Sequence, residues 1–318
     1  METSELQAIA ERSRSMREAG IALLLASVVL GAFLFIPLAP THPAQEVAAA
    51  AVAASSTDPA AFADVPIEAK AAIVYDLASG KVLFDKNAEA QLPLASLTKL
   101  LTVYTGLTVL GPDAVVTIPE DAVGLGAPQS FSAGEEFTLS DLARITLTGS
   151  LNDGAQSIAE AAAAEEGEST AQSLGSEAAA LGLSATYAVN GSGLDETTSI
   201  SGGYGSAYDV ARLAGDLAAL APQIAAATTQ SSASARSLAG VVHTIQNTNP
   251  GVSRAPRLLL SKTGYTDLAG GNLALVFDAG IGHPIAVVVL GSSEDARFTD
   301  ADALVAATLA YFAGTPSL

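Results

Sequence analysis

A serine and a lysine three residues apart open an apolar stretch of the chain. Ser96 and Lys99 stand near the start of ASLTKLLTVYTGLTVL, residues 95–110. Residues three apart lie on one face of a helix, so these two side chains can meet. A serine hydroxyl becomes a good nucleophile when a base takes its proton, and a neutral lysine is such a base. The alternative interpretation is a helix-capping serine beside a solvated lysine.

A second motif, Ser150-Leu151-Asn152, ends one predicted helix and leads into the next. The hydroxyl of Ser150 could pass a proton toward a leaving amine. The amide of Asn152 could orient Lys99 and bind an amide of the substrate. A plain helix cap is the alternative interpretation of Asn152.

A third motif, Lys262-Thr263-Gly264, lies in a predicted strand. Lys262 and Thr263 could bind a carboxylate. Gly264 removes the side chain where a peptide-like substrate must lie close to the strand. Lys262 would also act on the first motif, because a neighbouring cation and burial both lower the pKa of a lysine such as Lys99. Each motif alone is weak, and the three in this order are far more specific.

The elements that must position these residues follow from the hydrophobic pattern. Helical spacing continues from Ser96 and recurs at 138–150, 169–183, 206–220 and 300–314. Strand-like runs occupy 71–76, 81–87, 257–266, 272–280 and 283–291. Strands therefore stand at both ends of the sequence with helices between them. This order predicts an α+β fold, a mainly antiparallel five-stranded sheet flanked by helices, with a helical subdomain inserted at about 96–245.

The N-terminal part predicts a membrane anchor. Residues 19–39 carry no charge and are long enough to cross a bilayer as a helix. Three arginines precede this run and no Lys or Arg follows it until Lys70, which sets residues 1–18 in the cytoplasm. An Ala- and Pro-rich tether at 40–65 would lead to a catalytic domain at 66–318. A cleaved signal peptide is the competing interpretation.

Composition excludes several classes of function. The chain has 318 residues, 49% of them hydrophobic, and a formal net charge of −19. Such a charge repels nucleic acid. There is no cysteine, which excludes disulfides and thiolate metal sites, and the three histidines lack metal-ligand spacing. We expect neither a metal nor another cofactor.

The three motifs resemble those shared by penicillin-binding proteins and serine β-lactamases. The longer context is similar to the serine D-alanyl-D-alanine carboxypeptidases, the low-molecular-weight penicillin-binding proteins. This similarity runs from about Ala71 to Val289. The stretches that carry it are AAIVYDLASGKVLFDKNAEAQLPLASLTKL, GEEFTLSDLARITLTGSLNDGAQSIAEA, YAVNGSGLDE, YDVARLA, IQNTN and SKTGYTDLAGGNLAL.

The resemblance implies a β-lactamase/transpeptidase-like fold and a ping-pong acyl transfer. Ser96 would attack the penultimate D-Ala carbonyl of a peptidoglycan stem peptide, the terminal D-Ala would leave, and water would release the acyl group. It implies that Lys99 is the base, Ser150 and Asn152 the relay, and Lys262, Thr263 and Gly264 the strand motif. The N–H groups of Ser96 and Tyr265 would form the oxyanion hole. β-Lactam antibiotics would act as covalent inhibitors.

Two positions depart from the family pattern. Leu151 replaces the usual small residue of the second motif, and Ser192 stands where a histidine usually precedes GLD. Three other functions remain: an endopeptidase that cuts D-Ala cross-links, a serine β-lactamase, and a non-catalytic wall-binding module. The chain lacks the Glu-x-x-Leu-Asn string with which class A β-lactamases deacylate. The intact Ser96, Lys99 and Lys262 argue against the non-catalytic module.

Overall fold

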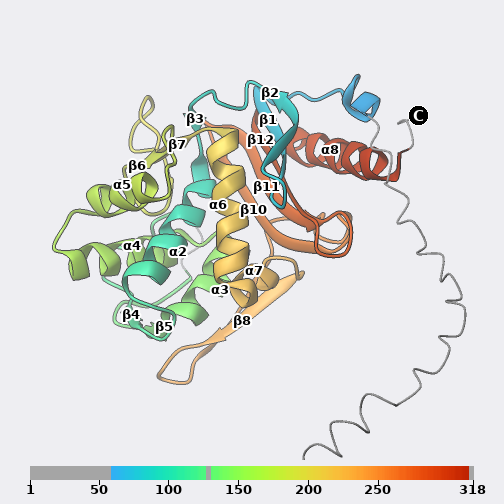
Figure 1. The fold of residues 1–318 in the computed structure, drawn as a ribbon. Helices are drawn as coiled ribbons and strands as arrows, with labels where there is room; N and C mark the ends of the chain where they lie inside the picture. The colour runs from blue at the N-terminus through green and yellow to red at the C-terminus, as the bar shows by residue number, and fades with distance from the viewer. Residues whose placement is uncertain (1–58, 127–129, 315–318) are drawn as a thin grey trace, which may run out of the picture. The chain divides into compact units, whose positions relative to one another are not determined.

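A five-stranded antiparallel sheet forms the centre of the computed structural model, which describes residues 59–126 and 130–314 (Figure 1). The strand order is β10-β11-β12-β1-β2. The strands are β1 (Ala71–Asp76), β2 (Lys81–Lys86), β10 (Leu258–Thr266), β11 (Gly270–Asp278) and β12 (Pro284–Ser292). The expected sheet is therefore confirmed, and its first two strands come from the opposite end of the sequence to the other three.

Alternating side chains of the central strands fill two separate cores. In the β1–β12 pair, Ile73 lies opposite Val288 and Val74 lies opposite Val287. Ile73 and Val288 belong to one buried cluster, and Val74 and Val287 belong to the other. Successive residues of a strand point to opposite faces of the sheet, so the runs of β-branched residues supply both cores.

Helices cover both faces of the sheet. One face packs against α8 (Ala296–Ala313) and the short 3-10 turn η1 (Pro59–Phe62). The other face carries the core shared with the remaining helices, among which α6 packs directly on β1 and β12 (Figure 1). These helices are α2 (Thr98–Val109), α3 (Leu139–Gly149), α4 (Asn152–Glu166), α5 (Thr170–Ala180), α6 (Ala207–Leu220) and α7 (Pro222–Ala227).

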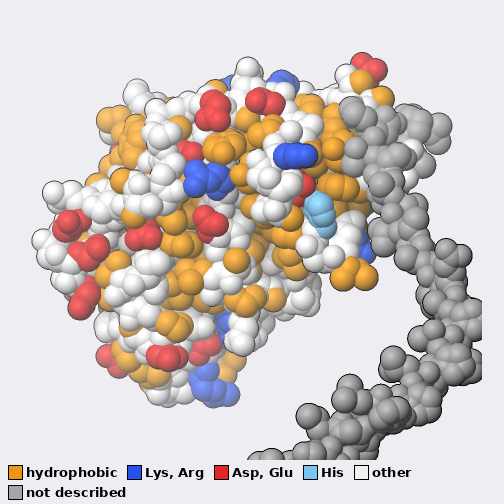
Figure 2. Space-filling model, viewed as in Figure 1, with side chains coloured by type: hydrophobic (Ala, Val, Ile, Leu, Met, Phe, Trp, Pro, Cys, Tyr) orange, Lys and Arg blue, Asp and Glu red, His pale blue; other side chains and the backbone are white. Residues whose placement is uncertain are grey.

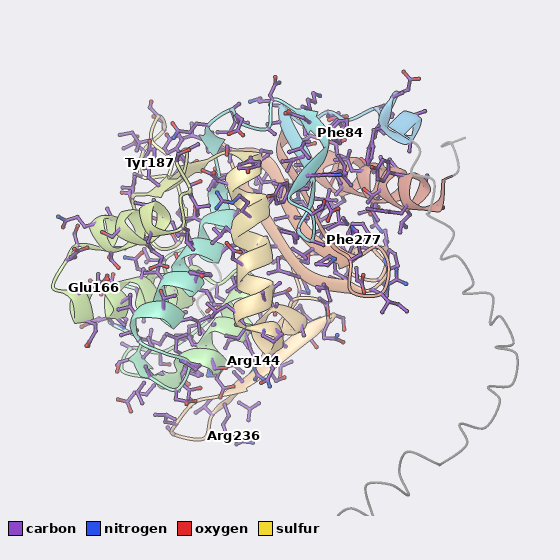
Figure 3. The ribbon with its side chains drawn as sticks, viewed as in Figure 1. Phe84, Arg144, Glu166, Tyr187, Arg236 and Phe277 are labelled. Carbon is purple, nitrogen blue, oxygen red and sulfur yellow. The ribbon has the colours of Figure 1, made fainter. Side chains whose placement is uncertain are left out.

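Three small sheets were not predicted. The first orders β3 (Leu92–Pro93), β7 (Gly203–Gly205) and β6 (Tyr187–Ala188), and the second pairs β4 (Val115–Thr117) with β5 (Glu136–Thr138). The third is the hairpin of β8 (Ser232–Arg236) and β9 (Val242–Gln246). Arg144 of α3 donates a hydrogen bond to the backbone oxygen of Ser234 at 2.6 Å, and Figure 3 labels this arginine near β8.

The N-terminal boundary of the folded part differs from the expected one. Residues 59–62, which we assigned to the tether, form η1, and Phe62 is buried against α8 and β2. The described part of the compact unit runs from Pro59 to Gly314. The expected anchor at 19–39 lies outside the described residues. Within the described ranges, no helix is both long and apolar enough to cross a bilayer.

Charged side chains are spread over the surface that Figure 2 shows. Acidic groups are interspersed with apolar ones, and the few basic side chains stand apart from each other (Figure 2). This face has no basic patch of the kind that nucleic acid requires.

Candidate active site

Ser96 lies in a tight turn just before the helix that carries Lys99. The turn is the 3-10 segment η2 (Ala95–Leu97), and α2 begins at Thr98. Ala95 has a φ of +48°, an uncommon conformation for a residue with a side chain, and such strain often accompanies functional sites. Ser96 remains half-buried while the residues on either side of it are buried.

The amine of Lys99 is held by three oxygen atoms. Its Nζ lies 2.9 Å from Ser96 Oγ, 2.7 Å from Asn152 Oδ1 and 2.6 Å from the backbone oxygen of Ser192. Lys99 is fully buried, and burial lowers its pKa to about 7 against the smaller opposing effect of the Asp153 carboxylate. A neutral amine has two N–H donors and one lone pair. With the donors on Asn152 and Ser192, the lone pair is left for the hydroxyl proton of Ser96.

The second motif and the strand motif meet across the same site. Ser150 ends α3 in the left-handed conformation, with a φ of +58°, and α4 begins at Asn152. Lys262 Nζ donates hydrogen bonds to Ser150 Oγ and to the backbone oxygen of Thr263, both at 2.8 Å. Ser150 and Lys262 are 112 residues apart in sequence, so this contact between the second and third motifs arises from the fold.

Lys262 is as deeply buried as Lys99. Burial, followed by the positive charges of Lys99 and Arg297, lowers the pKa of Lys262 well below that of an ordinary lysine. The Lys99 charge thus disfavours protonation of Lys262, and each amine finds only neutral oxygen atoms as hydrogen-bond acceptors. A carboxylate entering this site would favour the protonated form of Lys262 and accept a charge-assisted hydrogen bond from it.

β10 is an edge strand that passes close to the turn of Ser96. A Cβ atom placed on Gly264 would lie 2.9 Å from Leu94 O, closer than Cβ atoms come to other atoms, and at a tight 3.3 Å from Ser96 N. Glycine is therefore required here by the approach of two backbones. Thr263 Oγ1 makes a 2.6 Å hydrogen bond with Thr248 Oγ1, and the Tyr265 side chain is 45% exposed.

Three contributions escaped the sequence analysis. Asn190 Oδ1 accepts hydrogen bonds from the backbone N–H groups of Ser192 and Gly193, which shapes the loop that offers Ser192 O to Lys99. Asn272 Nδ2 donates to Pro93 O at 3.0 Å and thereby ties β11 to the segment before Ser96. Arg297 donates to Gly264 O from the start of α8. Asn190 and Asn272 lie within the quoted family-like stretches, but no sequence pattern indicated these contacts, and Arg297 lies outside those stretches.

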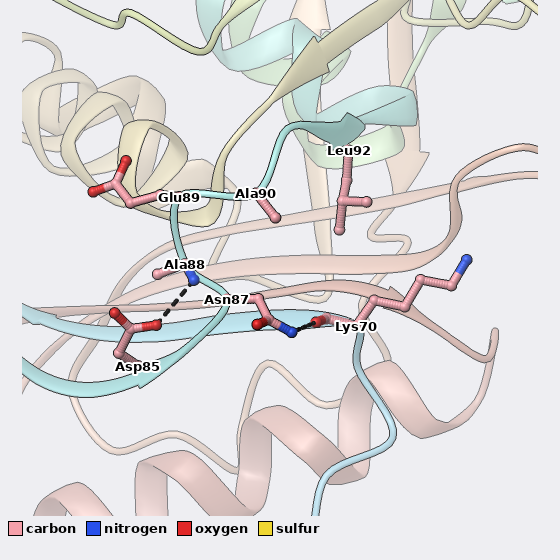
Figure 4. A pocket seen from close by; sticks show the side chains of 7 residues that line it. All are labelled: Lys70, Asp85, Asn87, Ala88, Glu89, Ala90 and Leu92. Atoms are coloured by element: carbon pink, nitrogen blue, oxygen red, sulfur yellow. Dashed lines mark hydrogen bonds between the residues drawn. The ribbon is translucent and has the colours of Figure 1, made fainter.

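A cavity near the start of β1 and the end of β2 stands apart from this arrangement. Its volume is about 450 Å³, and none of the three motifs contributes to its lining (Figure 4). The lining residues are Lys70, Asp85, Asn87, Ala88, Glu89, Ala90 and Leu92. The side chains of Asn87 and Asp85 are hydrogen-bonded to the backbone of Lys70 and Ala88, so few polar groups are left to bind a ligand in this cavity.

Comparison with known proteins points to one family. Residues 54–294 match the family model described as D-alanyl-D-alanine carboxypeptidase. DacF, a D-alanyl-D-alanine carboxypeptidase of Bacillus subtilis, is 33% identical over 156 residues, which cover 47% of this chain and 39% of DacF. DacC, the Escherichia coli protein of the same description, is 30% identical over 269 residues, which cover 77% of this chain and 62% of DacC. The chain thus spans less than two thirds of either curated relative.

A solved structure extends the comparison to the fold. Penicillin-binding protein D2 of Listeria monocytogenes, in its ampicillin-bound form, is 26% identical with a TM-score of 0.64. The match covers 77% of this chain and 98% of that protein. The predicted penicillin-binding fold is therefore confirmed.

Proposed function

The chain belongs to the D-alanyl-D-alanine carboxypeptidase family, and on that premise we propose that it removes the terminal D-Ala from peptidoglycan stem peptides through an acyl-enzyme on Ser96. The observation that carries this proposal is the buried Lys99 amine, 2.9 Å from Ser96 Oγ, with a pKa lowered to about 7. A lysine with an ordinary pKa would be protonated at neutral pH and could not accept the proton of Ser96.

Acylation begins with the transfer of the Ser96 hydroxyl proton to Lys99 Nζ. The serine oxygen then forms a bond to the carbonyl carbon of the penultimate D-Ala, and the carbonyl oxygen takes up negative charge. The N–H groups of Ser96 and Tyr265 stabilise this oxyanion. Such donors act strongly because they are fixed before the charge develops. The approach of Gly264 to Ser96 N supports this role by keeping β10 beside the turn.

Collapse of the tetrahedral intermediate releases the terminal D-Ala. The proton held by Lys99 passes to the leaving nitrogen by way of Ser150, whose Oγ already accepts from Lys262. Water then attacks the acyl-enzyme, and Lys99 serves as base a second time. The donors Lys262 and Thr263 hold the terminal carboxylate of the substrate, and Asn152 binds its amide while orienting Lys99.

The relatives extend the proposal to inhibitors and location. The Listeria relative is described in an ampicillin-bound form, and we infer that β-lactams acylate Ser96 here. The catalytic domain acts on the wall, outside the cytoplasmic membrane, tethered by one N-terminal helix. Support for that tether is the uncharged run 19–39 with three arginines before it, which lies outside the described residues.

The test uses the full chain with a labelled penicillin and a peptide ending in D-Ala-D-Ala. We expect one covalent adduct on Ser96 by mass spectrometry and stoichiometric release of D-Ala from the peptide. Ser96→Ala, a small change at a half-buried site, should abolish both while the thermal melting curve stays in place. An adduct on another residue, or release of D-Ala by Ser96→Ala, would refute the assignment. Faster cleavage of a cross-linked peptide dimer would instead indicate an endopeptidase.

A further inference from the structure

A buried arginine of α8 contacts β10, the strand that carries Lys262, Thr263 and Gly264. Arg297 lies in the first turn of α8, and its Nη1 donates to the backbone oxygen of Gly264 at 2.7 Å. Only 8% of Arg297 is exposed. The two residues are 33 positions apart in sequence, so the contact depends on how α8 packs on the sheet.

Arg297 has an unusual set of partners for a buried cation. Among the residues that the structure describes, no carboxylate lies within ion-pairing distance of its guanidinium. Its Nε is buried without a hydrogen-bond partner. The guanidinium packs over the ring of Phe298 at 4.7 Å and near that of Tyr265 at 6.0 Å. Buried arginines are ordinarily paired with acids, so a carbonyl oxygen as the polar partner calls for an explanation.

The carbonyl that Arg297 binds belongs to the peptide group that supplies the second oxyanion donor. The C=O of Gly264 and the N–H of Tyr265 are parts of one planar peptide unit and point in opposite directions. Arg297 therefore holds one end of this unit while the other end is directed away from it. A cation at the oxygen draws electron density from the nitrogen, which makes the N–H a stronger donor, as in polarised hydrogen-bond chains.

We propose that Arg297 is a positioning residue that orients and polarises the peptide group between Gly264 and Tyr265, and so strengthens the Tyr265 N–H as an oxyanion donor. Arg297 touches neither substrate nor the reacting atoms. The inference rests on the proposed function, because only an acyl transfer at Ser96 needs that N–H as a donor. The competing role is purely structural, a tether between α8 and β10.

The test compares Arg297→Lys, Arg297→Gln and Arg297→Met with the unchanged protein in acylation by a β-lactam. Loss of an entire oxyanion donor slows an enzyme by about 10²–10³. Since Arg297→Met only weakens the donor, we expect the acylation rate constant to fall about tenfold. The dissociation constant of the non-covalent complex should stay unchanged. Arg297→Lys, which keeps a cation, should recover most of the rate, and Arg297→Gln should not.

A vibrational measurement separates polarisation from tethering. A strong oxyanion hole lowers the stretching frequency of the ester carbonyl in the acyl-enzyme, so Arg297→Met and Arg297→Gln should raise that frequency and Arg297→Lys should do so less. The rate constants are compared at the plateau of each pH profile, because the Arg297 charge also lowers the pKa of Lys262. Should Arg297→Met fail to fold, the Lys and Gln variants still give the comparison.

Arg212→Met is the matched control. Arg212 lies in α6, outside the three motifs. Like Arg297, it donates hydrogen bonds from a helix to backbone oxygens, here those of Leu181 and Gly182. The Arg212→Met substitution should lower the melting temperature without changing the stretching frequency of the ester carbonyl in the acyl-enzyme. If the Arg297 variants behave in the same way, Arg297 is only a tether and the inference is overturned. If the unchanged protein forms no adduct on Ser96, the proposed function fails and the inference falls with it.

Discussion

At the scale of single residues, the chemistry depends on where one lysine amine is buried. The spacing of Ser96 and Lys99 predicted that their side chains would meet, and they lie 2.9 Å apart. The sequence could not reveal that Ser192 O also binds Lys99, because a backbone oxygen leaves no residue signature. It could not show the degree of burial either, and burial is the main cause of the lowered pKa of Lys99.

The lowered pKa predicts the pH dependence of acylation. Below about pH 7 Lys99 is protonated and cannot accept the Ser96 proton, so the second-order rate constant for acylation should rise tenfold per pH unit and level off above pH 7. Stopped-flow acylation across pH 5–10 measures this rise and the plateau above it. Lys99→Arg should be nearly inactive throughout, since a guanidinium keeps its proton. A flat profile from pH 5 to 9 would exclude Lys99 as base.

At the scale of elements, the site is the meeting point of one turn, one helix junction and one edge strand. The helix expected at 138–150 and the strand expected at 257–266 occur within one or two residues of those bounds. The hairpin of β8 and β9 was missed because SASAR carries no strong strand former to pair with the Val, Thr and Ile of VHTIQ. Arg297 was missed because it precedes the helix predicted to begin at residue 300, and its partner is set by tertiary packing.

The closeness of β10 to the Ser96 turn predicts the effect of Gly264→Ala. The added methyl would lie 2.9 Å from Leu94 O, so strand and turn must separate. We expect the unfolding free energy to fall by about 1–3 kcal/mol, as for overpacking. We also expect the acylation rate constant to fall strongly, because the two oxyanion donors move apart. Urea unfolding and adduct formation measure the two effects.

Gly175→Ala supplies the contrast to Gly264→Ala. Gly175 lies within α5, and a Cβ there would meet nothing within 4 Å. Alanine should therefore stabilise the helix by about 0.5–1 kcal/mol and leave acylation unchanged. Normal acylation by Gly264→Ala would show that the strand need not lie so close to the nucleophile.

At the scale of the whole folded unit, one face of the sheet supports the active site and the other is covered by α8 and η1. The face with α2 and α6 supports α2 and α4, which carry Lys99 and Asn152, and the turn before α2 that carries Ser96. The opposite face is covered by α8 and by η1, where the Phe62 ring packs 5.7 Å from Tyr311 and 5.9 Å from Phe84. The composition of residues 40–65 suggested a tether throughout, because one aromatic residue in an alanine-rich stretch gives no periodic signal.

This division predicts different outcomes for two truncated chains. A chain that starts at Ser55 keeps Phe62, whereas one that starts at Pro66 loses it. Phe62 is only 9% exposed, and removal of a buried phenylalanine ring costs about 3 kcal/mol. The shorter chain should therefore be less stable by about that amount in urea unfolding. It should still acylate at the same rate while folded, because Ser96 lies over the other core.

Phe62→Ala in the chain that starts at Ser55 identifies the cause. If the lost ring is responsible, this single change should reproduce most of the difference in unfolding free energy between the two truncated chains. The tilted contacts of Phe62 with Phe84 and Tyr311 are the only ring pairs that join η1 to the rest among the described residues, so no other aromatic contact compensates. Equal stability of the two truncated chains would mean that η1 is dispensable and that the folded unit begins near residue 66, as its sequence first indicated.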